Sequence, residues 1–426
     1  MNRPDIVVTG IGLVTSVGQS PTEVFDAICH GKSGIVVPSE DHSAYGVLEV
    51  MGQGPAIDPA SVMPGPEART IDRYIVMALV AAGHAIADSG IEAGVNVDPY
   101  RIATIVSGTG GLAAFENQVV LRTQKGRMGV SPYLLPGMLP NMGTARVAIK
   151  YGFRGYSSSI GTACAAGAQS IGEGMRILRS GEADVVVCGC AEAPLFPTLG
   201  DTFGNARALA KGWADDPTGA SRPFDLRRNG LVLAEGAGVV VLETAEHADA
   251  RGAAAYATLH GWGATTDAHH PTTPRPDGAA AAECMRLALR DAGVDPGEIE
   301  YLNAHGTSTK LGDAAESLAI RSVFGDRTPA VSSNKGITGH MLGASGAVEA
   351  AATIMSVGRG ILPHTHNLVD PDPACDVDLI QAEPRKRRIE LALSNSFGFG
   401  GHNVSLIIGH PRSRLSRFAD GDLAGS

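Results

Sequence analysis

Residues 161–170 read GTACAAGAQS and place one cysteine, Cys164, among small residues. A short β-prone run at residues 157–160 precedes this stretch, and a helical pattern follows over residues 169–180, up to Gly181. We therefore expect Cys164 to lie where a strand turns into a helix N-terminus. Unpaired N–H groups and the positive end of the helix dipole would lower the thiol pKa there, below its usual value of roughly 8.5. The local pattern equally fits a buried structural cysteine.

The composition is that of an ordinary globular chain of 426 residues, of which 44% are apolar and 18% charged. A formal net charge of −10 argues against a general nucleic-acid surface, which needs a basic excess. The 6 cysteines are too scattered for a disulfide framework and lack the paired spacing of a zinc site, so we expect no metal. No secretory signal or membrane-length apolar run is found, so we expect a cytoplasmic protein without a membrane partner.

Strand and helix patterns alternate along the chain in two successive series. Strand patterns lie at residues 5–9, 101–107, 183–190, 236–243, 256–262, 299–304 and 330–333, and helical patterns at 22–30, 72–89, 114–124, 169–180, 277–293, 313–324 and 344–358. Fully apolar strands indicate a sheet covered on both faces, and the alternation predicts an α/β architecture. The same order in both halves suggests a duplication. Residues 411–426 are polar, and we expect this tail to be frayed.

Three further stretches carry polar or glycine-rich residues beside strand ends. They are NAHGTST at residues 303–309, SNKGITGH at 333–340 and NSFGFGGHN at 395–403. His305, at a strand end, is well placed to face a cleft at the carboxyl edge of the sheet. The last stretch is so rich in glycine that it can point backbone N–H groups into a site. A cysteine, two histidines and a loop of N–H donors together suit acyl transfer from a thioester.

These motifs resemble the β-ketoacyl-acyl-carrier-protein synthases (ketosynthases), and most closely the elongating branch with a Cys-His-His site. The resemblance extends from about Ile6 to Gly409 and rests on four runs in the expected order. The runs are TACAAGAQSIGEG around Cys164, NAHGTSTKLGDAAE around His305, NKGITGHMLGASGAVEA around His340 and NSFGFGGHN near the end. The resemblance implies a thiolase-like, duplicated α/β fold with α/β/α/β/α layers. Its N-terminal half (1–254) would carry the nucleophile and its C-terminal half (255–410) both histidines.

The resemblance also implies a reaction. Cys164 looks like the nucleophile that takes the acyl chain from an acyl-carrier-protein thioester. His305 and His340 look like the pair that drives decarboxylation of malonyl-carrier protein and stabilises the resulting enolate. Two neutral imidazoles can donate to the enolate oxygen without quenching the carbon, so this chemistry requires no metal and no organic cofactor.

Several residues around this centre match supporting positions of the family. Lys335 resembles an active-site lysine that acidic partners hold. Asp313 and Glu316 match those partners and lie at i, i+3 on one helix face. Thr307 and Thr309 match the residues that hydrogen-bond the phosphopantetheine arm.

The glycine-rich loop matches the oxyanion hole and the gate of the family. The backbone N–H groups of Cys164 and Phe399 would form the oxyanion hole beside Gly398, and the Phe399 ring would cover the cysteine until an acyl chain enters. Thr109 occupies a position that looks onto the acyl tunnel, where its hydroxyl departs from the usual Ile or Gly. The candidates for docking an acidic carrier protein are Arg69, Lys125, Arg127 and Arg207.

Alternatives differ in pathway and in assembly. The chain could elongate fatty acids as a homodimer, or build polyketides beside a cysteine-less chain-length partner in a heterodimer. A thiolase shares the fold type and has an element that resembles residues 339–346, but it needs a second cysteine in the glycine-rich loop at 397–401, where none is present. A non-catalytic chain-length partner would lack the nucleophile, and Cys164 argues against that assignment.

Overall fold

The computed structural model describes residues 3–38, 42–63, 65–69, 71–412 and 415–418. A nine-stranded mixed sheet has the order β4-β5-β6-β1-β7-β13-β12-β8-β9. Its strands are β1 (Ile6–Val14), β4 (Ile102–Ser107), β5 (Val185–Glu192), β6 (Gly236–Thr244), β7 (Ala257–Thr266), β8 (Tyr301–Asn303), β9 (Ala330–Ser332), β12 (Leu391–Gly398) and β13 (His402–Gly409). Two small antiparallel sheets pair β2 (Ile35–Val36) with β3 (Met51–Gly52), and β10 (Ile361–Leu362) with β11 (Arg385–Lys386).

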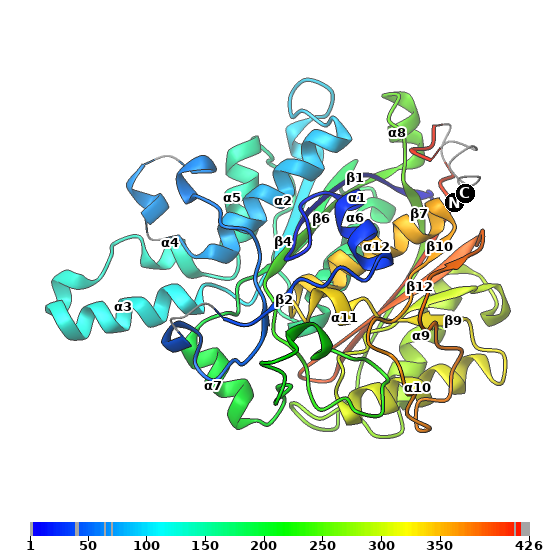
Figure 1. The fold of residues 1–426 in the computed structure, drawn as a ribbon. Helices are drawn as coiled ribbons and strands as arrows, with labels where there is room; N and C mark the ends of the chain where they lie inside the picture. Colours follow the sequence, from blue (N-terminus) through cyan, green and yellow to red (C-terminus); the bar gives the residue numbers. More distant parts are fainter. Residues whose placement is uncertain (1–2, 39–41, 64, 70, 413–414, 419–426) are drawn as a thin grey trace.

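Helices cover both faces of this sheet (Figure 1). They are α1 (Pro21–Cys29), α2 (Arg73–Ser89), α3 (Leu112–Lys125), α4 (Leu134–Met138), α5 (Met142–Tyr151), α6 (Ala166–Ser180), α7 (Pro197–Asn205), α8 (Ala245–Ala250), α9 (Ala279–Ala292), α10 (Lys310–Phe324), α11 (Lys335–Thr338) and α12 (Ala344–Arg359). Helices α6 and α12 pack against each other and against strands of both halves, and every residue of α12 except Arg359 is buried. Helices α2 and α5 cover the first half from outside, and α9 covers the second, with α10 packed against it. The predicted α/β/α/β/α layering is confirmed.

The two halves of the sheet have matching strand directions. In the first half β4 is parallel to β5, and β6 and β1 follow antiparallel. In the second half β8 is parallel to β12, and β13 and β7 follow antiparallel. The halves join where β1 pairs with β7, at Ile6–Leu259, Val7–Thr258 and Val8–Ala257.

In each half of the fold, one glycine sets the distance between a strand and its outer helix. Gly12 on β1 lies so close to α2 that a Cβ atom there would be 1.9 Å from the carbonyl oxygen of Ala81. Gly263 on β7 lies equally close to α9, where a Cβ atom would be 2.3 Å from the carbonyl oxygen of Cys284. A side chain at either position would push the helix off the sheet, so both outer layers depend on these glycines.

The structure corrects three expected elements near Cys164. Residues 157–160 form no strand; Ser157 makes only a single bridge to Thr104. Helix α6 begins at Ala166, three residues before the expected start at Gln169. The glycine-rich loop is shorter than expected, because β12 continues to Gly398 and pairs in register with β13 from His402 onward.

The described part of the C-terminal tail is ordered against the start of β7. The backbone N–H of Ala255 donates to Leu415 O, and the N–H of Arg417 donates to Ala255 O. The Phe418 ring meets the Tyr256 ring edge-on, with centroids 5.9 Å apart. The expectation of a frayed tail is therefore wrong for residues 415–418, while residues 413–414 and 419–426 lie outside the described residues.

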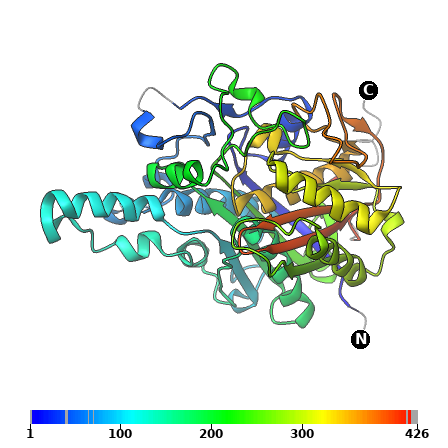
Figure 2. The ribbon, with the colours of Figure 1, turned by 90° about the horizontal axis from the view of Figure 1, so that it is seen from below.

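Helix α3 extends away from the rest of the molecule (Figure 2). It carries a set of exposed apolar side chains. The exposed apolar residues of α3 and the segments that follow it are Leu112, Phe115, Val119, Val120, Met128, Leu135 and Leu139.

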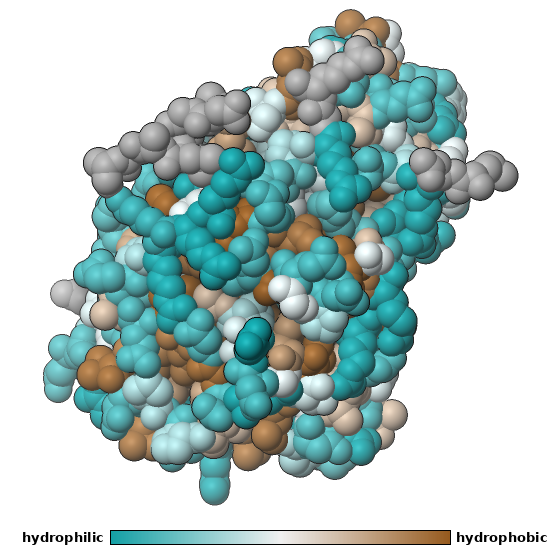
Figure 3. Space-filling view, turned by 90° about the vertical axis from the view of Figure 1, so that its right-hand side faces the viewer, coloured by the Kyte–Doolittle hydropathy of each residue, from teal (hydrophilic) through white to brown (hydrophobic). Residues whose placement is uncertain are grey.

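Hydrophilic side chains cover much of the face that carries β10, with hydrophobic residues between them (Figure 3). No helix within the described part of the chain is long and apolar enough to cross a membrane.

Substituting Gly12 by Ala should lower the free energy of unfolding by about 3 kcal/mol, near the upper end of typical overpacking costs. The cause is the clash of the new Cβ atom with the α2 backbone, which cannot move without leaving the sheet. Urea unfolding followed by circular dichroism measures the change. Gly297→Ala is the matched control, because a Cβ atom there meets nothing within 4 Å. Equal stability of the two variants would contradict this packing role.

Candidate active site

Cys164 lies in a single 3₁₀ turn, Ala163–Ala165, immediately before α6. Ala163 has φ 49°, a left-handed backbone conformation that costs free energy for any residue with a Cβ atom. Cys164 is 8% exposed and packs in an apolar cluster that includes Phe203 and Leu342. The strained turn therefore presents a largely desolvated thiol, at the helix start that the sequence predicted.

Both histidines reach the same place from the second half of the chain. His340 Nε2 lies 3.1 Å from Cys164 Sγ, and His340 Nδ1 lies 3.2 Å from Ser345 Oγ. Ser345 Oγ accepts from Met341 N, so its hydroxyl proton can be donated to Nδ1, which leaves the imidazole proton on Nε2. The His305 ring meets the His340 ring edge-on at a centroid distance of 5.4 Å. The structure thus brings the predicted Cys-His-His set together.

Burial controls the protonation of all three groups. Loss of solvent raises the pKa of Cys164 to about 12, although Lys335 and the backbone N–H groups of Phe399 and Cys164 lower it. Burial and the Lys335 charge hold the pKa values of His305 and His340 well below their usual range. The expectation that the helix terminus would lower the thiol pKa is therefore wrong, because desolvation outweighs it. The resting site contains a thiol and two neutral imidazoles.

Lys335 is held by a carboxylate that the sequence did not predict. Its ammonium group forms an ion pair with Glu349 of α12 and donates to His305 O at 2.5 Å, and both partners of the pair are about 1% exposed. Asp313 accepts instead from Phe224 N at 2.9 Å, and Glu316 accepts from His305 N at 2.9 Å. The predicted direct pairing of Lys335 with Asp313 and Glu316 is therefore wrong. Asp313 pairs with Arg228, whose Nε lies 3.4 Å from Oδ2, and Glu316 accepts from backbone N–H groups, while the Lys335 charge acts to lower the Glu316 pKa that burial raises.

A sequence signal for Glu349 was available. It is the only charged residue in the stretch ASGAVEAAATIMSVG, residues 344–358. A carboxylate in an otherwise apolar, small-residue helix has to be paired when the helix is buried. The direction in which α12 crosses Lys335 was not available from the sequence, so the partner could not be chosen.

The hairpin formed by β12 and β13 packs against the turn that carries Cys164. The N–H groups of Phe399 and Cys164 lie near enough to the Cys164 sulfur to act against the burial that raises its pKa. Gly398 lies so close that a Cβ atom there would be 2.6 Å from Thr162 O and 3.0 Å from Cys164 N. The Phe399 ring is 40% exposed and stacks on the ring of Phe203 from α7, at a centroid distance of 6.0 Å. Two N–H donors thus converge at the place predicted for an oxyanion hole.

Thr307 and Thr309 lie together just before α10, with their Oγ1 atoms 3.1 Å apart. Thr109 is exposed, and its hydroxyl donates to Glu192 Oε1 at 2.8 Å. Glu192 is buried at the end of β5, and burial raises its pKa to about 7, against the hydrogen bonds from Thr109 and Gly343. Glu192 was not predicted, because its sequence neighbours are those of an ordinary buried strand end.

The four basic docking candidates are all exposed, and they occupy three different segments. The described residues offer no ion-pair partner to any of them. Lys125 and Arg127 lie at the end of the α3 arm, Arg69 ends a short turn before α2, and Arg207 follows α7. No group of three His, Cys, Asp or Glu side chains within the described residues could hold a metal ion.

Alkylation of Cys164 by iodoacetamide should accelerate roughly tenfold per pH unit from about pH 7 to 9, because the thiolate fraction keeps rising below a raised thiol pKa. Mass spectrometry of the peptide that contains Cys164 measures the rate at each pH. Urea-unfolded protein is the control, and its rate should level off near the ordinary thiol pKa of about 8.5. A plateau below pH 8 in the folded protein would show a preformed thiolate and contradict the desolvated site.

Comparison with known proteins places this site in a family. The chain matches the description "Beta-ketoacyl synthase, N-terminal domain" over residues 3–248 and "Beta-ketoacyl synthase, C-terminal domain" over residues 256–369. A protein of Synechocystis sp. named 3-oxoacyl-[acyl-carrier-protein] synthase 2 is 39% identical over 409 residues, or 95% of this chain and 98% of that relative. A protein of the same name from Coxiella burnetii is 38% identical over 96% of this chain and 99% of its own length.

Solved structures agree with the sequence relatives. A type II polyketide ketosynthase, solved in complex with its acyl-carrier protein, superposes with a TM-score of 0.88 at 32% identity, over 96% of this chain and 100% of that chain. A β-ketoacyl synthase from Burkholderia phymatum also has a TM-score of 0.88, at 34% identity and with the same coverage. The motifs, the fold and the convergent Cys-His-His geometry thus agree with these similarities, and the chain belongs to the β-ketoacyl synthase family.

Proposed function

We propose that this chain catalyses the decarboxylative condensation of an acyl group held on Cys164 with malonyl-acyl-carrier protein, giving a β-ketoacyl-carrier protein. One observation carries the proposal. Cys164 Sγ lies 3.1 Å from His340 Nε2 and is faced by two backbone N–H groups, in a site where both imidazoles are neutral. This arrangement supports attack on a thioester followed by carbanion chemistry, and the curated relatives named above carry the name of that reaction class.

In the first half-reaction Cys164 attacks the thioester carbonyl of an acyl-carrier protein. The new C–S bond forms as the carrier thiolate leaves, and the cysteine proton ends on the carrier sulfur. The N–H groups of Phe399 and Cys164 hold the oxyanion of the tetrahedral intermediate, which is where preorganised donors contribute most to catalysis. The high thiol pKa in the resting site means that negative charge forms on sulfur or oxygen only when these donors are engaged.

In the second half-reaction malonyl-carrier protein loses CO₂ and its thioester becomes an enolate. His305 and His340 donate to the enolate oxygen, and the carbanion carbon attacks the acyl carbonyl on Cys164. The carbon–carbon bond forms as the C–S bond to the enzyme breaks, and the leaving thiolate takes up a proton from solvent to restore the thiol. Neutral imidazoles suit this step because imidazolium would protonate the carbanion. The Lys335–Glu349 ion pair supports the site by fixing the carbonyl of His305.

The partner that we propose is an acyl-carrier protein, whose phosphopantetheine arm reaches the site past Thr307 and Thr309. Its acidic surface would meet the docking residues Arg69, Lys125, Arg127 and Arg207. Thr109 would face the acyl chain with a hydroxyl that Glu192 holds. One similar structure is named as a ketosynthase with a chain length factor, so both a homodimer and such a heterodimer are compatible with the proposal. The exposed apolar side chains of α3 provide a surface that either kind of dimer could bury.

Fatty-acid elongation is the pathway that we favour, because the curated relatives cited above share one name from fatty-acid chemistry. The ketosynthase subunit of a type II polyketide system is the alternative. We further propose a cytoplasmic location and a division of the chain at residues 254 and 255. Neither the condensation nor the proposed supporting residues call for a metal or organic cofactor.

Cys164→Ala should abolish covalent acylation, because it removes the sulfur that lies beside the N–H donors. Incubation with an acyl-acyl-carrier protein and intact-mass measurement should show an acyl adduct on the wild type and none on the variant. Cys29→Ala is the matched control, since Cys29 is a partly exposed thiol at the end of α1. It should acylate like the wild type. An unmodified wild-type protein would contradict the nucleophile assignment.

His340→Ala should slow decarboxylation of malonyl-carrier protein by about 10²–10³, the cost of losing one general-acid or oxyanion donor. Release of labelled CO₂ measures the rate directly. His364→Ala is the control, because His364 is also a buried histidine but belongs to the loop after β10. Undiminished CO₂ release by His340→Ala would remove His340 from this step.

A further inference from the structure

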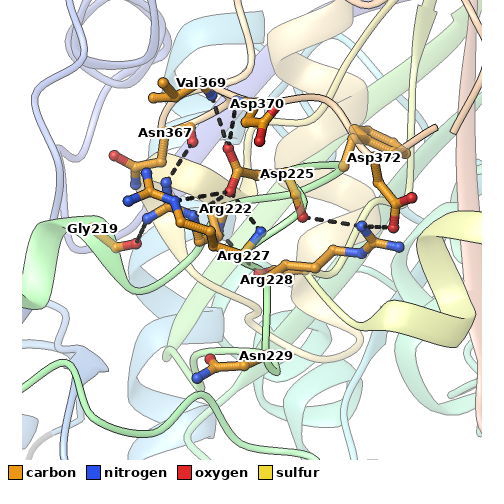
Figure 4. Close-up of polar contacts among 12 residues, drawn as sticks. Gly219, Arg222, Asp225, Arg227, Arg228, Asn229, Asn367, Val369, Asp370 and Asp372 are labelled. Atoms are coloured by element: carbon orange, nitrogen blue, oxygen red, sulfur yellow. Dashed lines mark hydrogen bonds and ion pairs between the residues drawn. The ribbon is translucent and has the colours of Figure 1, made fainter. Parts of the chain in front are cut away.

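A second buried polar network lies beside the predicted pantetheine residues and is not used by the chemistry at Cys164. It is built on the turn at residues 222–228, which carries Arg222, Asp225 and Arg228 (Figure 4). Arg228 is among the largest fully buried side chains of the protein, with only 1% of its surface exposed. A buried guanidinium is costly unless all of its donors are used, so its partners report what it holds.

Arg228 joins three segments that are far apart in the sequence. Its Nε donates to Thr309 O at 3.2 Å and its Nη2 to Lys310 O at 3.0 Å. Its Nη1 donates to Asp372 Oδ2 at 2.7 Å and to Asp225 O at 3.0 Å. All three nitrogens are therefore engaged, and two of them grip consecutive carbonyls at the start of α10. This fork geometry belongs to arginine and cannot be reproduced by lysine.

The segment at residues 307–310 is strained, and residues of the same turn also form hydrogen bonds to Ser308. Ser308, between the two threonines, has φ 69°, a left-handed conformation unfavourable for a residue with a side chain. Arg222 N donates to Ser308 Oγ at 3.0 Å, and Gly230 N donates to Ser308 O at 3.2 Å. Such a conformation persists only where surrounding contacts over-determine it. Residues 222–230 supply those contacts.

On its other side, the turn at residues 222–228 is hydrogen-bonded to the loop that contains Asp372. Asp225 Oδ2 accepts from the N–H groups of Val369 and Asp370, both at 2.9 Å. Asp225 Oδ1 accepts from Arg222 Nε at 2.8 Å, and Asp372 N donates to Phe224 O at 2.9 Å. The turn thus lies between the threonine segment and the 369–372 loop, and Arg228 reaches both.

We propose that Arg228, braced by Asp372, is a positioning residue that sets the grip of Thr307 and Thr309 on the phosphopantetheine arm of the carrier protein. The inference rests on the proposed function, because it assumes that the arm passes these threonines. Arg228 makes none of its hydrogen bonds to Cys164, His305 or His340. Its Nε also lies 3.4 Å from Asp313 Oδ2 on α10, so loosening Arg228 acts on the start of α10 and the threonines before it rather than directly on the reacting groups.

The test is a steady-state comparison of Arg228→Lys and Asp372→Asn with the wild type, using malonyl-carrier protein as the varied substrate. Arg228→Lys keeps the charge and loses the fork, while Asp372→Asn keeps the shape of a residue that is 20% exposed. We expect KM to rise about tenfold in Arg228→Lys and about threefold in Asp372→Asn, with kcat within about twofold, the pattern of lost uniform binding. The rate of Cys164 alkylation by iodoacetamide should be unchanged.

The matched control is Arg251→Lys. Arg251, the residue after α8, forms a similar forked pair with the buried Glu243 of β6, in elements that do not carry the threonines. It should lose stability without a change in KM. The proposal is overturned if Arg228→Lys and Asp372→Asn lower kcat at constant KM, or raise KM no more than Arg251→Lys does. If Arg228→Lys does not fold, Asp372→Asn decides by the same criterion. A wild-type protein without condensing activity would instead refute the proposed function.

Discussion

Desolvation of one cysteine and two histidines is the constraint on which the site depends. Burial outweighs the helix terminus at Cys164, and burial together with the Lys335 charge lowers the pKa values of His305 and His340, so all three groups are neutral at rest. A thiol in this state contains little thiolate near neutral pH and therefore reacts slowly with general electrophiles. The same neutrality lets the imidazoles stabilise an enolate without delivering a proton to carbon. Acyl transfer and carbanion chemistry can therefore share one pocket.

The duplicated fold explains how these groups meet. Cys164 comes from the turn before the central helix α6 of the first half, and His340 from the loop before the central helix α12 of the second. Gly167 N donates to Gly343 O at 3.1 Å, and a Cβ atom on Gly167 would lie 2.5 Å from that same oxygen. The cysteine turn and the histidine loop are thus joined by direct backbone contact. The site lies at the junction of two halves whose outer layers rest on Gly12 and Gly263.

The sequence allowed the fold class, the nucleophile and both histidines to be predicted, because each is carried by a contiguous motif. It did not allow the thiol pKa to be predicted, because the helix start is local whereas burial comes from α7 and the β12–β13 hairpin. The predicted partners of Lys335 were wrong for a similar reason. The i, i+3 spacing of Asp313 and Glu316 is a local pattern, and the path of α12 that brings Glu349 to Lys335 is tertiary. The network around Arg228 had no local signal, since its partners outside its own turn come from two distant segments.

Nitrogen NMR of protein labelled at histidine tests the central claim most directly, because it reads the protonation state of each ring in the resting protein. His305 and His340 should stay neutral from about pH 8 down to about pH 5.5, below the usual imidazole pKa of roughly 6.5. The titration of His340 should also be insensitive to Cys164→Ala. A His340 that is protonated near pH 7 and becomes neutral in Cys164→Ala would reveal a thiolate–imidazolium pair and contradict a neutral, desolvated site.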